Sequence, residues 1–270
     1  MDSFTDLNRY TAKKDRLQAL KPGDIVRWPS ILSRYDTVVV ANELAPVKNP
    51  SAAWRQAYIA ALSNFASSGG NLVLTDAAIA GLPELGTGID PAAVKGGFFY
   101  AGWMDFDDGE GPTYDRHPLA AGVNMEGTAE GIGNVGDLTF DNRHQTYEPV
   151  PLGYYVGPGG SGNASCTSDR CDSPNWIVDE AAWTAAGGTV AAKTLVRETT
   201  EPDSAASTGV SLGELPFGDG VIRIGGALLP DPTEENHHPY GLASYSVTYT
   251  GYQVFENLIR FDRATGTAAG

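Results

Sequence analysis

Residues 69–79 read GGNLVLTDAAI, in which two glycines precede a short apolar run and a carboxylate follows it. The run Leu72-Val73-Leu74 is typical of a buried strand, because a strand covered on both faces is apolar at successive positions. The small residues after Asp76 favour a sharp turn into a helix. The segment therefore predicts a parallel strand that ends in the kind of turn where α/β proteins place functional residues.

A second strand and a helix precede this segment. Residues 37–42 read TVVVAN, a β-branched run that indicates another buried strand. Pro50 and Ser51 then begin a helix. Its core-facing stripe is expected to contain Trp54, Tyr58, Ile59, Leu62 and Phe65. The order strand, helix, strand over residues 37–75 predicts a βαβ unit with a right-handed crossover.

Weaker patterns continue along the rest of the chain. Further strands are expected at 97–101, 152–156 and 189–196, with a hairpin at 215–224. Helical patterns cover residues 4–20, 178–186 and 240–261. Residues 105–150, 157–175 and 198–210 are rich in polar residues, glycine or turn formers and are expected to be irregular, the second of these segments being of low complexity.

The composition is that of an acidic globular protein. Its 270 residues are 41% hydrophobic and 19% charged, so a sizeable core is expected. The formal net charge of −15 argues against nucleic acid, whose phosphates need Lys and Arg, and against an anionic membrane surface. No apolar run approaches the ~20 residues that a membrane-spanning helix needs. We therefore expect neither a nucleic-acid partner nor membrane insertion.

Two features of the sequence bear on the location of the protein: its N-terminal residues and its two cysteines. The opening residues MDSFTDLNRY lack the pattern of a secretory leader and read as interior sequence, so we expect a domain of a larger protein. Cys166 and Cys171 form a C-x4-C pair that favours a small disulfide ring, with two free thiols as the alternative; no second Cys pair completes a zinc site. Because disulfides persist in oxidising compartments, the pair predicts an extracellular, secreted protein.

Motifs late in the chain extend the pattern begun by the two strands. Residues 224–229 read IGGALL and precede His238-Pro239, residues 251–258 read GYQVFENL, and residues 116–119 read RHPL. In this order the motifs resemble the class I glutamine amidotransferase-like superfamily, in its trehalose-utilisation-like branch. The resemblance implies an α/β fold with three layers and a mostly parallel, flavodoxin-like central sheet flanked by helices, with long irregular loops.

The resemblance also implies a domain organisation. Residues 1–34 would be a helical or irregular N-terminal extension, and 35–262 the amidotransferase-like α/β domain. A loop insertion would occupy about 157–175, and residues 263–270 would form a tail.

The chain departs from that superfamily at its catalytic triad. Asp76 stands where the family has its nucleophilic Cys, and Tyr240 stands where the Glu of a His-Pro-Glu motif would be. A triad needs a nucleophile, a base beside it and a group that orients the base. The resemblance therefore implies a pseudoenzyme: a non-catalytic accessory domain of a larger secreted bacterial protein, such as a peptidase or other hydrolase. Its role would be structural support or the binding of a partner or ligand.

An alternative is an active hydrolase-type enzyme with a different site, acting on a small polar or sugar-like substrate. Asp76 and His238 would be its catalytic residues. The carboxyl edge of the sheet could also gather the ligand-binding candidates Asn42, Glu43, His117, His237 and Tyr240. Carboxylates with imidazoles can bind zinc or act as acid and base. The opposing interpretation is structural: each side chain hydrogen-bonds a loop or caps a helix, with Asp76 as the N-cap of the helix that follows it.

A second acidic segment raises the question of calcium. Asp105, Asp107 and Asp108 bring closely spaced carboxylates, which suit a hard cation. The segment lacks the bidentate Glu of a complete EF-hand loop, so a solvated acidic loop is the competing interpretation. Calcium and zinc are thus the two metals for which the sequence offers ligands, and neither is required by the accessory-domain hypothesis.

Overall fold

The computed structural model describes residues 18–41, 49–100, 103–106, 117–122, 143–145, 147–149, 172–198, 204–227, 245–247 and 249–261. The helices are α2 (Pro22–Arg27), α3 (Ala52–Ser67), α4 (Glu180–Ala185) and α5 (Tyr249–Ile259). Shorter 3-10 helices are η2 (Pro29–Arg34), η3 (Asp76–Gly81), η4 (Pro83–Leu85), η5 (Pro91–Ala93) and η7 (Pro118–Ala120). The strands are β1 (Thr37–Val40), β2 (Asn71–Thr75), β3 (Val94–Tyr100), β4 (Trp103–Asp105), β5 (Arg143–Gln145), β6 (Tyr147–Pro149), β7 (Asp172–Val178), β8 (Thr189–Arg197), β9 (Ala206–Phe217), β10 (Gly220–Gly225) and β11 (Tyr245–Val247).

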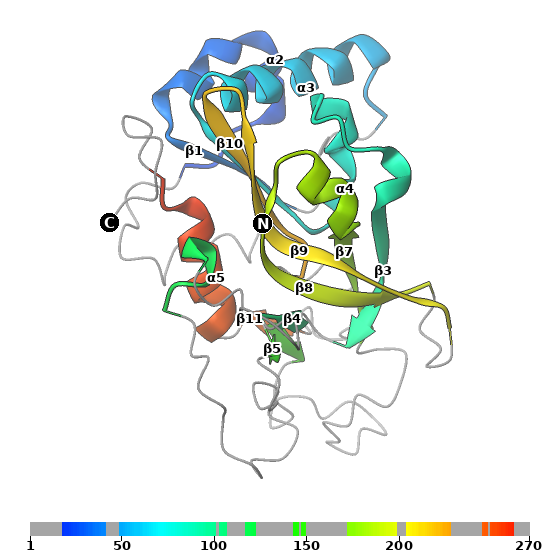
Figure 1. The fold of residues 1–270 in the computed structure, drawn as a ribbon. Coiled ribbons are helices and arrows are strands. Elements are labelled where there is room, and N and C mark those ends of the chain that lie inside the picture. The colour runs from blue at the N-terminus through cyan, green and yellow to red at the C-terminus, as the bar shows by residue number, and fades with distance from the viewer. Residues whose placement is uncertain are drawn as a thin grey trace, which may run out of the picture.

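The fold belongs to the α/β class, with a mixed sheet that curls into a half-barrel (Figure 1). Nine strands pair in the order β1-β2-β10-β9-β7-β3-β8-β4-β5, and β8 also pairs with β9. A separate pair joins β11 to β6. In Figure 1, α2 and α3 lie together at the top, α5 lies at the left, and β8 and β9 form a long curved ribbon across the middle.

The expected βαβ unit is confirmed. β1 pairs with β2 in parallel, in the register Thr37 with Asn71 and Val40 with Leu74. α3 connects them, and the hydroxyl of Ser51 caps it by accepting a hydrogen bond from the backbone N–H of Trp54 at 3.2 Å. Gly69, with φ of 93°, lies just past the end of α3 and lets the chain turn back into β2.

The expectation of a mostly parallel sheet is wrong. Only β1 with β2 and β2 with β10 pair in parallel, whereas the other pairings of the large sheet are antiparallel. The physical reason is the connections, because a parallel pair needs a crossover such as α3. β9 and β10 are instead joined by the tight turn at residues 218–219, which reverses the chain, as expected for the hairpin at 215–224.

Other expected elements have mixed outcomes. The strands at 97–101 and 189–196 correspond to β3 and β8. All three segments expected to be irregular contain strands, since β5 and β6 lie inside 105–150, β7 begins inside 157–175 and β9 begins inside 198–210. The helical pattern at 240–261 narrows to α5, and residues 245–247 are a strand instead. The expected helix at 4–20 and strand at 152–156 lie outside the described residues, apart from 18–20, which are not helical.

Helices pack on both faces of the part of the sheet formed by β1, β2 and β10. Leu72 and Leu74 of β2 belong to a cluster with Leu62 of α3, which we call the α3-side core. Val73, between them, belongs to a cluster with Phe255 of α5, which we call the α5-side core. Because successive side chains of a strand point to opposite faces and both faces are covered, β2 is buried at every position and apolar at its three central residues.

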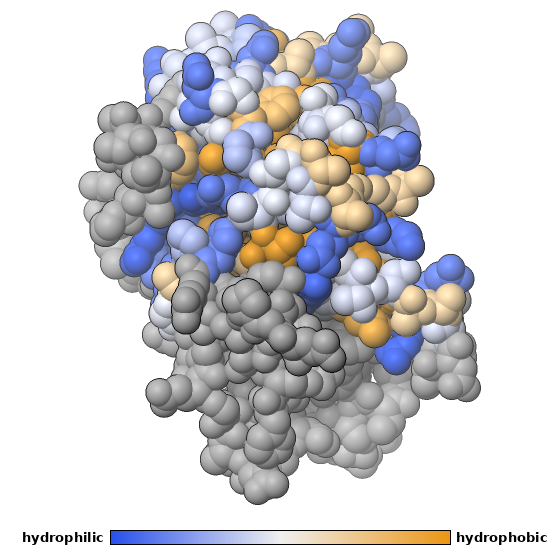
Figure 2. Space-filling view, in the orientation of Figure 1, coloured by the Kyte–Doolittle hydropathy of each residue, from blue (hydrophilic) through white to orange (hydrophobic). Residues whose placement is uncertain are grey.

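The surface of the described part is mixed in character. Figure 2 shows hydrophilic and hydrophobic residues interspersed on the face that it presents. Trp28, at the end of α2, is the large hydrophobic residue that stays exposed within the described ranges, at 54%. None of the helices in those ranges is both long enough and apolar enough to cross a membrane.

Candidate functional site

Asp76 lies at the carboxyl end of the central parallel strand. β2 is flanked by β1 and β10, and its last residue, Thr75, pairs with Gly225. Asp76 follows as the first residue of η3 and is 3% exposed. Its φ of 49° places it in the left-handed region, which residues with a Cβ adopt at a cost. Backbone strain of this kind is often found at functional turns. The turn predicted after the strand therefore contains a residue with strained backbone angles.

The interpretation of Asp76 as a helix N-cap is wrong. Thr75 occupies the N-cap position of η3, and no side-chain hydrogen bond caps this helix. An N-cap residue has extended backbone angles, as Thr75 does with φ of −112° and ψ of 145°. Asp76 is already inside the turn, with the opposite sign of φ. Asp76 therefore does not occupy the N-cap position of η3.

We predict that the strain at Asp76 can be measured by comparing two substitutions. Both Asp76→Gly and Asp76→Ala remove the carboxylate, but only Ala keeps a Cβ at φ of 49°. Asp76→Gly should therefore be more stable than Asp76→Ala by about 1 kcal/mol in urea unfolding. At the neighbouring Ala77, also in η3, the order should reverse, with Ala77→Gly less stable than the parent by about 0.5–1 kcal/mol. Equal stability of the two Asp76 variants would contradict the strained conformation.

His117, the second site candidate that the structure describes, uses both ring nitrogens inside the fold. Its Nδ1 accepts a hydrogen bond from the backbone N–H of Leu119 at 3.1 Å, which makes His117 the N-cap of η7. Its Nε2 lies 2.8 Å from Oγ1 of Thr189, the first residue of β8. Because Nδ1 is an acceptor, a neutral ring carries its proton on Nε2 and donates it to Thr189.

The protonation state of His117 is consistent with this assignment. Burial lowers the pKa of His117 from its ordinary value; the Glu214 carboxylate opposes the shift and the Arg223 guanidinium adds to it. A ring that already donates from Nε2 cannot take a proton from the Thr189 hydroxyl, so the close contact is not a nucleophile–base pair. Neither nitrogen has a lone pair left for a metal or a ligand in this arrangement.

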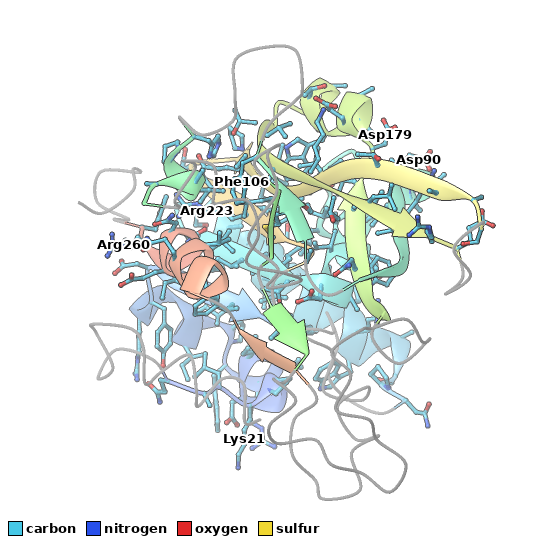
Figure 3. All side chains as sticks on the ribbon, turned by 90° about the horizontal axis from the view of Figure 1, so that it is seen from below. Lys21, Asp90, Phe106, Asp179, Arg223 and Arg260 are labelled. Atoms are coloured by element: carbon cyan, nitrogen blue, oxygen red, sulfur yellow. The ribbon has the colours of Figure 1, made fainter. Side chains whose placement is uncertain are left out.

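A polar network that sequence reasoning missed lies at the end of α5. Arg223 of β10 is 2% exposed, and its Nε donates to Oε2 of Glu214 at 2.7 Å. Its Nη1 donates to the carbonyl oxygens of Asn257, Leu258 and Arg260 at 3.2, 3.0 and 2.8 Å. Figure 3 shows Arg223 beside one end of α5, close to Arg260. The last carbonyl groups of a helix lack partners within the helix, and a cation suits them.

Asn71 and Thr37 complete the docking of this helix end. The amide of Asn71 donates to the carbonyl oxygen of Leu258 at 2.8 Å and to Oγ1 of Thr37 at 3.0 Å. The hydroxyl of Thr37 donates to the carbonyl oxygen of Ile259 at 3.0 Å. One signal in the sequence could have revealed the network: Arg223 interrupts the apolar run of β10, and a charge buried in a strand needs partners.

The closing-helix motif has a clear structural role at Asn257. Its Nδ2 donates to the carbonyl oxygens of Leu119 at 2.9 Å and Ala121 at 2.7 Å. Its Oδ1 accepts from Nε2 of Gln253 at 3.2 Å. Two of the sequence motifs, RHPL and GYQVFENL, therefore meet in space, because the turn that contains His117 packs against α5.

The remaining candidates cannot be placed. The site residues Asn42, Glu43, His237, His238 and Tyr240 lie outside the described residues, as do Asp107, Asp108, Cys166 and Cys171. Asp105 is the last residue of β4, where its backbone pairs with Arg143 and Lys193. Within the described ranges, no group of three or more His, Cys, Asp or Glu side chains is arranged to hold a metal ion. Calcium, zinc and the disulfide stay predictions.

Comparison with known proteins identifies no family for the chain. No protein-family model matches it. No curated protein is significantly similar to it.

Proposed function

We propose that the chain contains a class I amidotransferase-like domain that has lost amide hydrolysis. It would serve as an accessory domain of a larger secreted bacterial protein, such as a peptidase or other hydrolase, in structural support or in binding a partner or ligand. In this proposal the part built on β1, β2 and β10, with α3 and α5 on its two faces, is a three-layer, flavodoxin-like core.

One observation carries the proposal: the turn after β2 has the strained geometry of a functional turn but holds a carboxylate. Asp76 has φ of 49° and is almost completely buried. A strand-to-helix turn with such strain is how α/β enzymes expose a nucleophile. A carboxylate attacks amides poorly. A buried carboxylate at this turn therefore fits an amidotransferase-like scaffold that has lost amide hydrolysis.

The arrangement of His117 supports the same proposal. A hydrolytic site needs a base with a free lone pair within hydrogen-bond reach of the nucleophile. The imidazole of His117 has both nitrogens engaged with Leu119 and Thr189. This histidine therefore fits a structural role, and a site at Asp76 would need a base from elsewhere in the chain.

The first test is an assay of ammonia release from glutamine and small amides by the purified protein. We expect no turnover above the uncatalysed rate, and the same result for Asp76→Ala and Asp76→Asn. Turnover by the parent that Asp76→Ala abolishes would overturn the proposal. Loss in Asp76→Ala with retention in Asp76→Asn would show that the carboxylate acts through hydrogen bonding rather than as a nucleophile or base.

The second candidate function is an enzyme of the hydrolase type with a carboxylate or metal site, acting on a small polar or sugar-like substrate. The observation that favours it is also the strain at Asp76, since strained residues cluster at active sites. Elemental analysis of the purified protein separates the two candidates. About one zinc per chain, lost together with activity in Asp76→Ala, would favour the enzyme. The accessory-domain proposal predicts no stoichiometric transition metal.

A further inference from the structure

The turn at residues 117–122 is fastened to the fold from two sides. Leu119 and Ala120 are buried in the α5-side core, and the Asn257 side chain of α5 holds the carbonyl oxygens of Leu119 and Ala121. On the other side, Nε2 of His117 meets the hydroxyl of Thr189 on β8. His117 is thus the residue through which the turn reaches the sheet, while Asn257 joins it to the helix.

Only a neutral imidazole can make the bonds that His117 makes. Nδ1 accepts from the N–H of Leu119, and a protonated ring would place a second N–H against that donor. Protonation therefore removes the N-cap of η7 and turns an attraction into a repulsion. The contact with Thr189 survives protonation, because Nε2 carries a proton in both states. The sensitive contact is the one within the turn.

The charged groups around His117 do not favour an imidazolium strongly. Glu214 of β9 and Arg223 of β10 act on the ring with opposite signs and form an ion pair with each other. On the two elements that pack against η7, Lys193 of β8 pairs with Glu180 and Glu256 of α5 pairs with Arg260, while Arg197 lies at the opposite end of β8 from Thr189. The α5 side chains at the turn are the neutral Gln253 and Asn257.

We propose that His117 is a proton-operated latch, which keeps the turn 117–122 closed through its N-cap bond to Leu119 when neutral and lets this turn open when protonated. The direction follows from linkage. Burial lowers the pKa of His117 in the fastened state, whereas a released ring has an ordinary pKa. Release therefore takes up a proton between these two values. As the pH falls through that window, the equilibrium constant for release should rise by up to about tenfold per pH unit, and above about pH 6.5 it should be constant.

The test is NMR of the full chain. The ring nitrogen signals of His117 give its tautomer and its titration. Hydrogen exchange of the Leu119 amide, corrected for the intrinsic pH dependence of exchange, gives the opening of the turn. We expect the proton on Nε2 at neutral pH, and an opening of Leu119 that increases as the pH falls below about 6.5. The amide of Leu72 in β2 is the internal reference and should show no parallel increase.

Two variants make the test specific. His117→Asn keeps an N-cap acceptor for Leu119 but has no group that titrates in this range, so its opening should be independent of pH. Thr189→Val removes the partner of Nε2 and keeps Nδ1, so its turn should open more at neutral pH and still respond to acid. If His117→Asn does not fold, the parent protein decides by itself, since the proposal requires the opening of Leu119 to follow the titration of the ring.

Three results would overturn the latch. One is a His117 ring that titrates at or above the ordinary value in the folded protein. Another is an opening of Leu119 that ignores pH or keeps its pH response in His117→Asn. The third is parallel exchange of Leu72 and Leu119, because this would mean global unfolding rather than release of a turn.

Discussion

Replacing Arg223 by methionine should lower the free energy of unfolding by about 3–5 kcal/mol. The substitution keeps most of the side-chain volume but leaves Glu214, which is only 30% exposed, without its partner. It also removes the donor shared by the carbonyl oxygens of Asn257, Leu258 and Arg260. Urea unfolding followed by tryptophan fluorescence measures the loss.

The matched control for Arg223→Met is Arg55→Met. Arg55 pairs with Glu84 through Nε at 2.8 Å, but both side chains are about two-fifths exposed. An exposed pair contributes about 0.2–1 kcal/mol, so this variant should remain close to the parent. The double variant Arg223→Met/Glu214→Leu should recover part of the lost stability, because it no longer leaves the Glu214 carboxylate without its partner. If Arg223→Met and Arg55→Met lowered the free energy of unfolding equally, burial would not explain the contribution of the Arg223 network to stability.

The second large effect is expected at Gly226, just past the end of β10. Its backbone N–H donates to Ser211 and its carbonyl oxygen accepts from the N–H of Trp176, each at 2.7 Å. A Cβ at this position would collide with the carbonyl oxygen of Trp176 and lie 3.0 Å from Cδ1 of Ile79. Since a backbone oxygen of β7 cannot move aside alone, Gly226→Ala should cost about 3 kcal/mol or more, at the upper end of overpacking.

Gly23→Ala is the control for this second prediction. Gly23 is an exposed residue of α2, and nothing lies within 4 Å of a Cβ built there. Alanine in a helix should raise stability by about 0.5–1 kcal/mol, partly by restricting the unfolded chain. The same chemical change thus has opposite signs at the two sites. A tolerated Gly226→Ala would show that β7 and β10 do not cross as closely as described.

The part of the fold that sequence predicts well is the part encoded locally. β1, α3 and β2 are continuous apolar or amphipathic segments bounded by Ser51 and the glycines at 69–70, so their type and order follow from pattern alone. β7 escaped because its first residues, Asp172–Asn175, are polar and include Pro174, and the beginning of β9 escaped because residues 206–209 are small or polar and resemble a loop. Their place in the sheet depends on neighbours distant in sequence, and single-segment patterns carry no such information.

The candidate site, like the fold, could be predicted from the sequence only in part. The position of Asp76 at the end of a buried strand was predictable from GGNLVLTD, but its left-handed backbone and its burial were not. The sequence makes His117 a candidate for ligand binding, whereas in the structure both of its ring nitrogens are engaged in holding a turn. Arg223 was overlooked because it lies in the predicted hairpin at 215–224, where a charged residue can be exposed to solvent. Its burial depends on α5, which folds over it and lies far from it in sequence.

The docking of α5 has a consequence for the order in which the protein folds. Asn71 bonds to Leu258 across a separation of 187 residues, and Thr37 bonds to Ile259 across 222. Contacts between such distant parts of a chain are slow to form, because a long loop must close before they stabilise anything. During synthesis, β1 and β2 leave the ribosome long before the helix that satisfies them. The face of this sheet that α5 covers is therefore completed last, and until then Arg223 has Glu214 beside it but none of the α5 carbonyl groups.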